Sequence, residues 1–128
     1  MRDGDRVLRE VVLPARREDV WAAITRPEHL SEWFGGAVDL EPEPRGRVRH
    51  RDASGAMWEG VVLSADRPFR LVWWWSRVDA DIEDADEGTR VEFVLLEHSE
   101  GTTLTVTETA ARHPSAGAHG PAFALTLR

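Results

Sequence analysis

Two polar side chains of this sequence could do acid–base chemistry in the interior of a predicted sheet. On one predicted strand His50 shares the alternation of Val48, and on the last predicted strand Glu108 shares that of Val106. Because side chains two positions apart lie on the same face of a strand, both polar groups are expected to point inward. There they could orient the polar group of a ligand, or act as an acid and base pair, as a buried carboxylate with a raised pKa can. The alternative is that each lies near a strand end and meets water.

Tryptophan is the second residue type with chemical potential. Trp58, Trp73 and Trp75 fall on the apolar side of two further predicted strands. A tryptophan offers a large apolar face and one N–H donor, so these three could stack on a ligand. Packing within a core explains them equally well, because a residue that lines a cavity in such a sheet is also a core residue.

No cofactor and no metal ion are expected. The chain has no cysteine, and all 16 of its basic residues are arginine, so it has no thiolate nucleophile and no Schiff-base or P-loop lysine. The five histidines lack metal-ligand spacing such as His-Glu-x-x-His. The acidic stretch at 79–87 partly resembles a calcium loop, but Asp84 stands where that loop needs glycine and Arg90 stands at its twelfth position. We interpret it as a solvated hairpin loop.

Length and charge define the class of protein. The 128 residues fit one domain, 1–128, and 41% apolar residues can build one core. The net charge of −7 argues against binding to nucleic acid or to an anionic membrane. No stretch reaches the roughly 20 apolar residues that span a bilayer, and the first ten residues lack the apolar centre of a signal peptide. A cytoplasmic protein is expected.

The segment 16–36 predicts two short helices that must position part of this interior. Apolar residues recur at helical spacing before and after Pro27, so each helix has one apolar face. Proline suits the first turn of a helix and disfavours helix at the residue before it, so Arg26 should end the first helix. Gly35 and Gly36 should end the second.

Alternating segments separated by turn residues predict about seven strands, at 6–13, 37–41, 47–51, 57–64, 70–77, 90–98 and 102–109. One face of these strands is expected to enclose a shared interior, and the residues assigned to that inward face are Trp58, Gly60, Val62, Leu71, Trp73, Trp75, Val91, Phe93, Leu95, Leu104 and Val106. Several strands are also apolar on the second face, which needs cover from helices or from a second subunit. The residues assigned to that face are Val61, Leu63, Trp74, Val94 and Leu96, with Trp74 the leading candidate for a subunit interface.

The sequence resembles the START-like superfamily, and within it the family named for an activator of the heat-shock protein 90 ATPase. The resemblance spans 6–109 and rests on EDVWAAITRPEHLSEWF at 18–34, PRGRVRHRDASG at 44–55, WEGVVL at 58–63 and DRPFRLVWWW at 66–75. It implies an α+β helix-grip fold, START-like or Bet v-like, in which a curved antiparallel sheet wraps around a long C-terminal helix and encloses an apolar cavity. Such cavities bind lipids, polyketides or hormones. The two helices at 16–36 would then form a lid at one cavity mouth.

The end of the chain departs from that family pattern. Only 110–128 follow the last predicted strand, and the stretch 121–128 has the spacing of either a two-turn helix or a strand. A shortened C-terminal helix would leave the groove open to a partner, to exchanged tails or to a bulky ligand. We therefore expect a homodimer with Trp74 and the tail 121–128 at its interface.

Two classes of function follow from the resemblance. The first, which we favour, is noncatalytic binding of a small hydrophobic molecule. The second is an enzyme of the polyketide cyclase or dehydratase type, and a third hypothesis, a regulator of a chaperone ATPase, rests on the family name alone. The expected ligand-binding residues are Trp33, Phe34, His50, Trp58, Val62, Leu71, Trp73, Trp75, Phe93, Leu104 and Glu108.

Overall fold

The computed structural model describes residues 6–78 and 87–114 of the chain, and within these ranges seven strands and two helices follow one another. Their order is β1 (Arg6–Leu13), α1 (Arg17–Ile24), α2 (Pro27–Phe34), β2 (Ala37–Leu40), β3 (Arg47–Arg51), β4 (Met57–Asp66), β5 (Arg70–Arg77), β6 (Glu87–His98) and β7 (Gly101–Arg112). The predicted α+β class is confirmed. Strands β4, β6 and β7 are longer than predicted. Their pairing with neighbouring strands continues into polar and turn residues, which the alternation of apolar and polar residues does not identify as strand. The predicted acidic loop and the stretch 121–128 lie outside the described residues, apart from the last acidic position, which begins β6.

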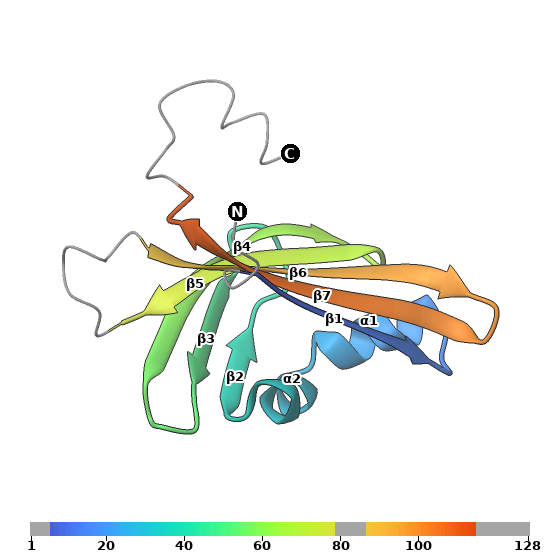
Figure 1. The fold of residues 1–128 in the computed structure, drawn as a ribbon, viewed down its shortest axis with the longest axis horizontal. Helices are drawn as coiled ribbons and strands as arrows, with labels where there is room; N and C mark the ends of the chain where they lie inside the picture. Colours follow the sequence, from blue (N-terminus) through green and yellow to red (C-terminus); the bar gives the residue numbers. More distant parts are fainter. Residues whose placement is uncertain (1–5, 79–86, 115–128) are drawn as a thin grey trace, which may run out of the picture.

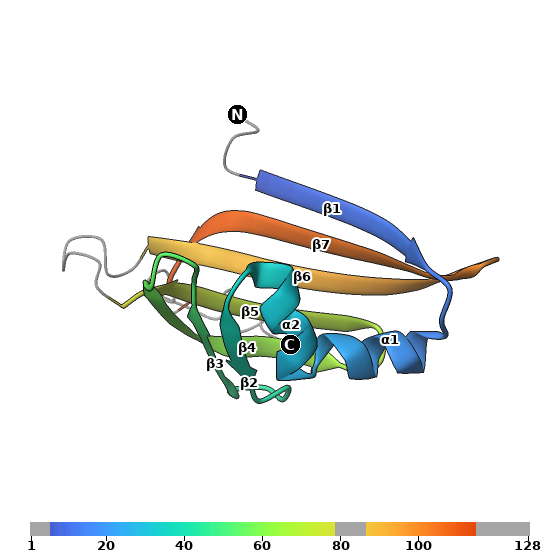
Figure 2. The ribbon, with the colours of Figure 1, turned by 90° about the horizontal axis from the view of Figure 1, so that it is seen from below.

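The strands form one antiparallel sheet in the order β1-β7-β6-β5-β4-β3-β2. The sheet curls, and both helices lie on its concave side, as Figures 1 and 2 show. Only one neighbour flanks β1, which pairs with β7 along its whole length. Because the chain passes from this edge strand through the two helices to the opposite edge, α1 and α2 bridge the mouth of the curved sheet.

Glycine allows the sheet to bend sharply where β4 meets β5. Gly60 pairs with Trp75, and a Cβ at position 60 would collide with the backbone of Trp74 and Trp75. The register also shifts between Val62 and Ser64, which is the mark of a β-bulge and adds local bend and twist. The missing side chain and the bulge together direct the aromatic residues of β5 into the concave side.

Local signals set both helix boundaries of α2. Arg26 is extended, with ψ of 130°, and Pro27 occupies the first turn. Gly35 ends the helix in the left-handed region at φ 76°, a conformation that glycine adopts without a Cβ penalty. Ser31 then ties the end of α2 to the sheet, because its hydroxyl accepts a hydrogen bond of 3.0 Å from the Val38 backbone N–H.

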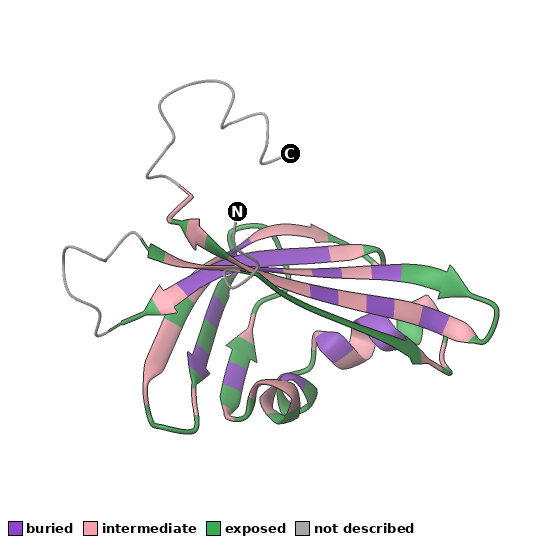
Figure 3. Cartoon of the chain, in the orientation of Figure 1, coloured by how far each residue is buried: buried purple, intermediate pink, exposed green. Residues whose placement is uncertain are grey.

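The core fills the concave side of the sheet. The predicted inward sets on β4, β5, β6 and β7 all lie there, and α1 and α2 add four buried residues of their own. Burial runs along the central strands and the inner side of α1, whereas β1 is exposed over most of its length (Figure 3). The members that the helices contribute are Val20, Trp21, Ile24 and Leu30.

The expectation that Trp74 is an exposed interface residue is wrong. It lies on the convex face, as predicted by alternation, but is 4% exposed. Its indole N–H donates a 2.9 Å hydrogen bond to the Ala111 carbonyl, and its ring packs edge-on against His113 at 4.7 Å. Gly88 leaves room for the ring, since a Cβ there would collide with it. The chain itself therefore covers Trp74, because β7 extends further than alternation predicted.

The turn between β3 and β4 is organised around one carboxylate. Asp52 Oδ1 accepts hydrogen bonds from the backbone and hydroxyl of Ser54 and from the Ala56 N–H, and Oδ2 accepts one from the Trp58 indole at 3.1 Å. The Ser54 hydroxyl and the Trp58 N–H, followed by the two backbone donors, hold the pKa of Asp52 well below its ordinary value of 3.8. These contacts fix both the hairpin and the orientation of Trp58.

We expect Asp52→Asn to weaken this turn and to reduce the acid sensitivity of the fold. Because the pKa of Asp52 is lower in the folded state, its stabilising effect is complete above about pH 4 and is lost as the pH falls through the folded-state pKa. The melting temperature of the unmodified protein should therefore fall more steeply below about pH 4 than that of the variant. Circular dichroism melts across this range test the difference, with the exposed Asp39→Asn as control. Parallel curves for the variant and the unmodified protein would contradict the assignment.

Candidate functional site

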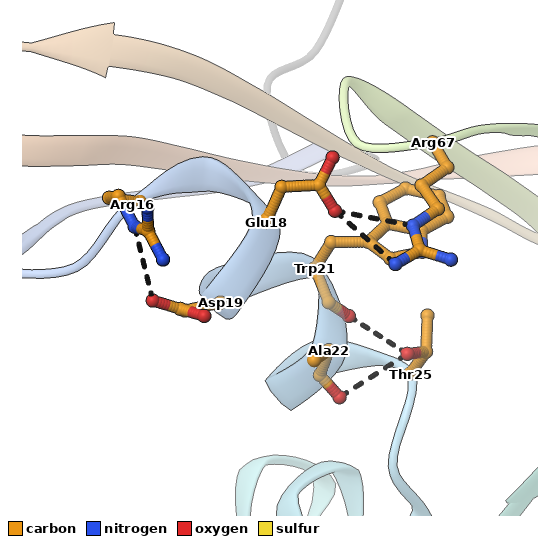
Figure 4. Close-up of polar contacts among 7 residues, drawn as sticks. All are labelled: Arg16, Glu18, Asp19, Trp21, Ala22, Thr25 and Arg67. Carbon is orange, nitrogen blue, oxygen red and sulfur yellow. Dashed lines mark hydrogen bonds and ion pairs between the residues drawn. The ribbon is translucent and has the colours of Figure 1, made fainter.

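Helix α1 forms ion pairs with the β4–β5 turn and with strand β6. Glu18 accepts two contacts of 3.3 Å from Arg67 in the β4–β5 turn (Figure 4), and Arg17 lies 3.4 Å from Glu97 on β6. Thr25 closes the helix end by donating to the Trp21 carbonyl at 2.8 Å. With Trp21 also buried, α1 is a fixed wall of the concave side.

Helix α2 buries fewer side chains than α1 over the same side. Leu30 is its one buried residue, and the two aromatic residues at its end, Trp33 and Phe34, are half-buried. Its polar tie to the sheet is Ser31, which bonds to Val38 on β2. An extended Arg26 and a glycine pair bound this helix.

Aromatic rings from the sheet and from α2 form one continuous cluster. Trp75 is its centre, with ring-centroid distances of 5.1 Å to Trp73, 5.2 Å to His50, 5.3 Å to Phe34 and 6.0 Å to Trp58. The cluster continues from Trp73 to Phe93 at 5.1 Å and from Phe93 to Trp33 at 6.5 Å. We call these seven residues, Trp33, Phe34, His50, Trp58, Trp73, Trp75 and Phe93, the aromatic cluster.

His50 is a buried member of this cluster. It is 5% exposed, and its ring is stacked on Trp75 with an interplanar angle of 20°. Its Nδ1 lies 3.1 Å from the Ala37 carbonyl, and since a carbonyl can only accept, Nδ1 carries the proton. The alternative that His50 meets water at a strand end is therefore wrong. The bond leaves Nε2 as the nitrogen that a ligand could reach.

Glu108 also lies on the concave side, but at its other end. Its carboxylate is 3.3 Å from the Arg9 guanidinium on the edge strand β1. Three strands, β4, β5 and β6, stand between the strands of His50 and Glu108. His50 contacts Ala37, Phe34 and Trp75, whereas Glu108 pairs with Arg9, so the structure does not bring the two together as an acid and base pair.

An apolar groove opens between the two helices and the β1–β7 edge. It has a volume of about 320 Å³, at the lower end of the roughly 300–1,000 Å³ typical of small-molecule sites. Trp33 and Leu104 belong both to this groove and to the predicted ligand-binding set. The residues that line it are Leu13, Val20, Ala23, Ile24, His29, Leu30, Glu32, Trp33 and Leu104. Through Trp33 and Phe93 the groove adjoins the aromatic cluster.

A larger hollow of about 730 Å³ lies at the end of the sheet near the β4–β5 and β6–β7 turns. Five of its eleven lining residues are charged, and Arg17 spans it by pairing with Glu97 and by lying 4.6 Å from the centre of the Phe69 ring. The smaller groove differs from this hollow in that its lining is largely apolar and adjoins the buried cluster. The described residues contain no group of three or more metal-ligating side chains.

More of the predicted ligand-binding residues lie on the sheet side of the groove and aromatic cluster than on their helix side. The predicted Val62 and Leu71 are fully buried beneath the cluster, and Phe34, as predicted, lies over the rings. The prediction missed the groove wall formed by α1 and by Leu13 of β1. Those residues are ordinary apolar positions of an amphipathic helix and a strand, and their spacing does not distinguish a cavity wall from a packed core.

The curved antiparallel sheet with two helices after its first strand defines a START-like, helix-grip protein, as the sequence predicted. Residues 14–123 match the family model described as Activator of Hsp90 ATPase homolog 1-like protein. The chain belongs to this family. No curated protein matches it. Within 6–78 and 87–114 no helix is long and apolar enough to cross a membrane.

Solved structures show the same fold. MLL2253 from Mesorhizobium loti has a TM-score of 0.70 at 23% identity, with 95% of this chain and 93% of that chain covered. DynU16, a protein of the dynemicin biosynthetic locus, has a TM-score of 0.66 at 25% identity. The match covers 96% of this chain but only 42% of DynU16. CalU16 from Micromonospora echinospora has a TM-score of 0.60 at 22% identity, with 84% and 60% covered.

We expect Phe34→Ala to open the aromatic cluster. The ring of Phe34 covers His50, Trp73 and Trp75, so its removal should admit water and shift tryptophan emission to longer wavelength. The expected loss of stability is about 2 kcal/mol, below the roughly 3–5 kcal/mol of a fully buried phenylalanine because Phe34 is half-exposed. Urea unfolding followed by fluorescence measures both effects.

The matched control for this change is Phe69→Ala. Phe69 is 43% exposed and lies away from the aromatic cluster, under Arg17. Its removal should leave the emission maximum unchanged. Equal spectral shifts in the two variants would show that Phe34 does not cover the tryptophans.

Proposed function

We propose that this protein binds a small hydrophobic molecule, lipid- or polyketide-like, between the helices and the concave face of the sheet, without transforming it. The observation that carries the proposal is the apolar groove of about 320 Å³ that adjoins the aromatic cluster through Trp33. Aromatic walls provide large apolar contact area for a ring-containing ligand. A bulky ligand would extend from the groove into the cluster by displacing Phe34, since α2 buries fewer side chains than α1.

The comparisons support a small-molecule role without naming the molecule. DynU16, at 25% identity, comes from a locus for dynemicin biosynthesis. This chain spans less than half of that protein, so the full activity of DynU16 is no guide to this one. The shared fold is one that encloses a cavity, and the cavity residues described above are this chain's own.

The arrangement of polar groups favours binding over catalysis. A cyclase or dehydratase would need an acid and a base within reach of the same reacting atoms. His50 and Glu108 lie on strands with three others between them, and Arg9 already pairs with Glu108. A chaperone-regulating role has the family name as its support and no described surface that argues for it.

Blocking the groove should abolish ligand binding. Ala23 lines the groove on α1, so Ala23→Phe should fill it and weaken binding of the neutral fluorescent probe N-phenyl-1-naphthylamine at least about tenfold, as loss of most of a groove's apolar contact would. Ala22→Phe, the same change one position earlier and outside the groove lining, should alter binding by less than about twofold. A probe titration by fluorescence measures both. Absence of binding to the unmodified protein, or equal binding by Ala23→Phe, would refute the proposed function.

A homodimer remains a prediction, although Trp74 can no longer supply its interface. Light scattering at micromolar concentration is expected to give twice the mass of one chain. A monomer alone would contradict it. Native mass spectrometry of freshly purified protein reports the subunit count and any retained molecule together, and so connects this prediction to the ligand.

A further inference from the structure

Two buried side-chain polar atoms of the described residues have no hydrogen-bond partner, and both lie on the concave side. They are the indole Nε1 of Trp73, a residue with no exposed surface, and Oε2 of Glu108. One is a donor and the other an acceptor. In folded proteins nearly all buried polar groups are paired, so each exception calls for a physical explanation.

The sheet register places these two residues in one row. Trp73 on β5 stands opposite Val91 on β6, and Val91 stands opposite Glu108 on β7. Directly opposed residues in an antiparallel sheet project from the same face, so Trp73 and Glu108 flank the side chain of Val91. Two strand spacings separate their backbones, about 10 Å, and the concave curl of the sheet brings the side-chain ends nearer to each other.

The residues around Trp73 and Glu108 determine what kind of ligand could bind to both. The Trp73 ring is enclosed by Phe34, Trp75 and Phe93, so its N–H meets apolar walls. Glu108 Oε2 itself forms an ion pair with Arg9 Nη2 at 3.3 Å, which compensates its charge, but the contact lacks hydrogen-bond geometry and leaves Oε2 able to accept from a ligand. A donor and an acceptor are thus fixed several ångströms apart along an apolar surface.

The half-buried Phe34 packs over the Trp73 end of this row. It is the last residue of α2, immediately before Gly35 in the left-handed region, and its ring lies 6.0 Å from that of Trp73. Of the three rings that enclose the indole, Phe34 is the one that comes from a helix and not from the sheet.

We infer that the ligand is an apolar ring molecule with two polar substituents: a carbonyl-type acceptor that binds the Trp73 N–H, and a hydroxyl-type donor that binds Glu108. This inference rests on the proposed function and names the chemistry of its ligand. It assigns Trp73 and Glu108 as specificity-determining residues, and Val91 as the apolar spacer between them. Arg9 holds the Glu108 carboxylate in place through the ion pair.

Indole resonances test the donor directly. The chain has six tryptophans, so a nitrogen-15 correlation spectrum has six indole signals, and the Trp73 signal is the one lost in Trp73→Phe. We expect 6-hydroxytetralone, with its carbonyl and hydroxyl on opposite sides of a fused ring, to shift this signal downfield. Tetralin, the same ring system without polar groups, should bind without that shift.

Affinities measured in the same titrations test both residues. Trp73→Phe should weaken 6-hydroxytetralone about threefold to tenfold, as loss of one hydrogen bond does, and Glu108→Gln should weaken it by a similar factor. Neither change should alter tetralin binding by more than about twofold if the lost interactions are polar. Trp33→Phe, the same indole-to-phenyl change at the groove mouth, serves as control and should not discriminate between the two probes.

The outcomes separate this inference from the proposed function. If tetralin and 6-hydroxytetralone bind equally and the Trp73 signal does not respond, the polar assignment is wrong and apolar binding stands. If neither probe binds, both proposals are wrong. Glu108→Gln keeps the test decisive even where Trp73→Phe disturbs the core, because Glu108 lies at the sheet margin with 22% of its side chain exposed.

Discussion

The packing of rings around Trp75 is the interaction on which the rest of the structure depends. Trp75 contacts His50, Trp58 and Phe34, and so joins three strands and one helix at a single point. The contact requires Gly60 opposite Trp75, because a side chain at that position would collide with the β5 backbone. The curl of the sheet, the burial of a histidine and the position of α2 follow from filling this concave side with aromatic rings. Such rings leave planar faces and few donors, which suits an apolar ligand better than a reaction centre.

The two helices that cover this surface bury different numbers of side chains against it. Helix α1 buries three side chains and forms ion pairs with the β4–β5 turn and with β6, whereas α2 depends on Leu30 and Ser31 together with the rings at its end. Local opening occurs first where few apolar contacts are buried. In the proposed binding mode, a ligand displaces the Phe34 ring while α1 keeps the groove in shape. Binding and closure in such a site are coupled through the same aromatic contacts.

Much of the fold could be predicted because its signals are local. Period-two alternation assigned the inward face of four strands correctly, and Pro27 and Gly35 marked α2 to the residue. The wrong predictions concern the surroundings of side chains. Alternation predicts which face of the sheet a side chain points from, but it does not predict which other residues cover or contact it. Trp74 points outward as predicted, yet the extended β7 and the space left by Gly88 bury it. His50 and Glu108 both point inward, but strand order keeps them apart.

The sequence by itself determined the strands, the broken helical pair and the aromatic character of the concave face, because side-chain period, proline and glycine act within a few residues. Only the tertiary structure decided which inward side chains meet. Strand order and register set Trp73 and Glu108 in one row across Val91, and α1 and α2 turn ordinary apolar positions into the wall of a groove. Those relations join residues far apart in the chain, and they arise from the closure of the whole sheet around its rings.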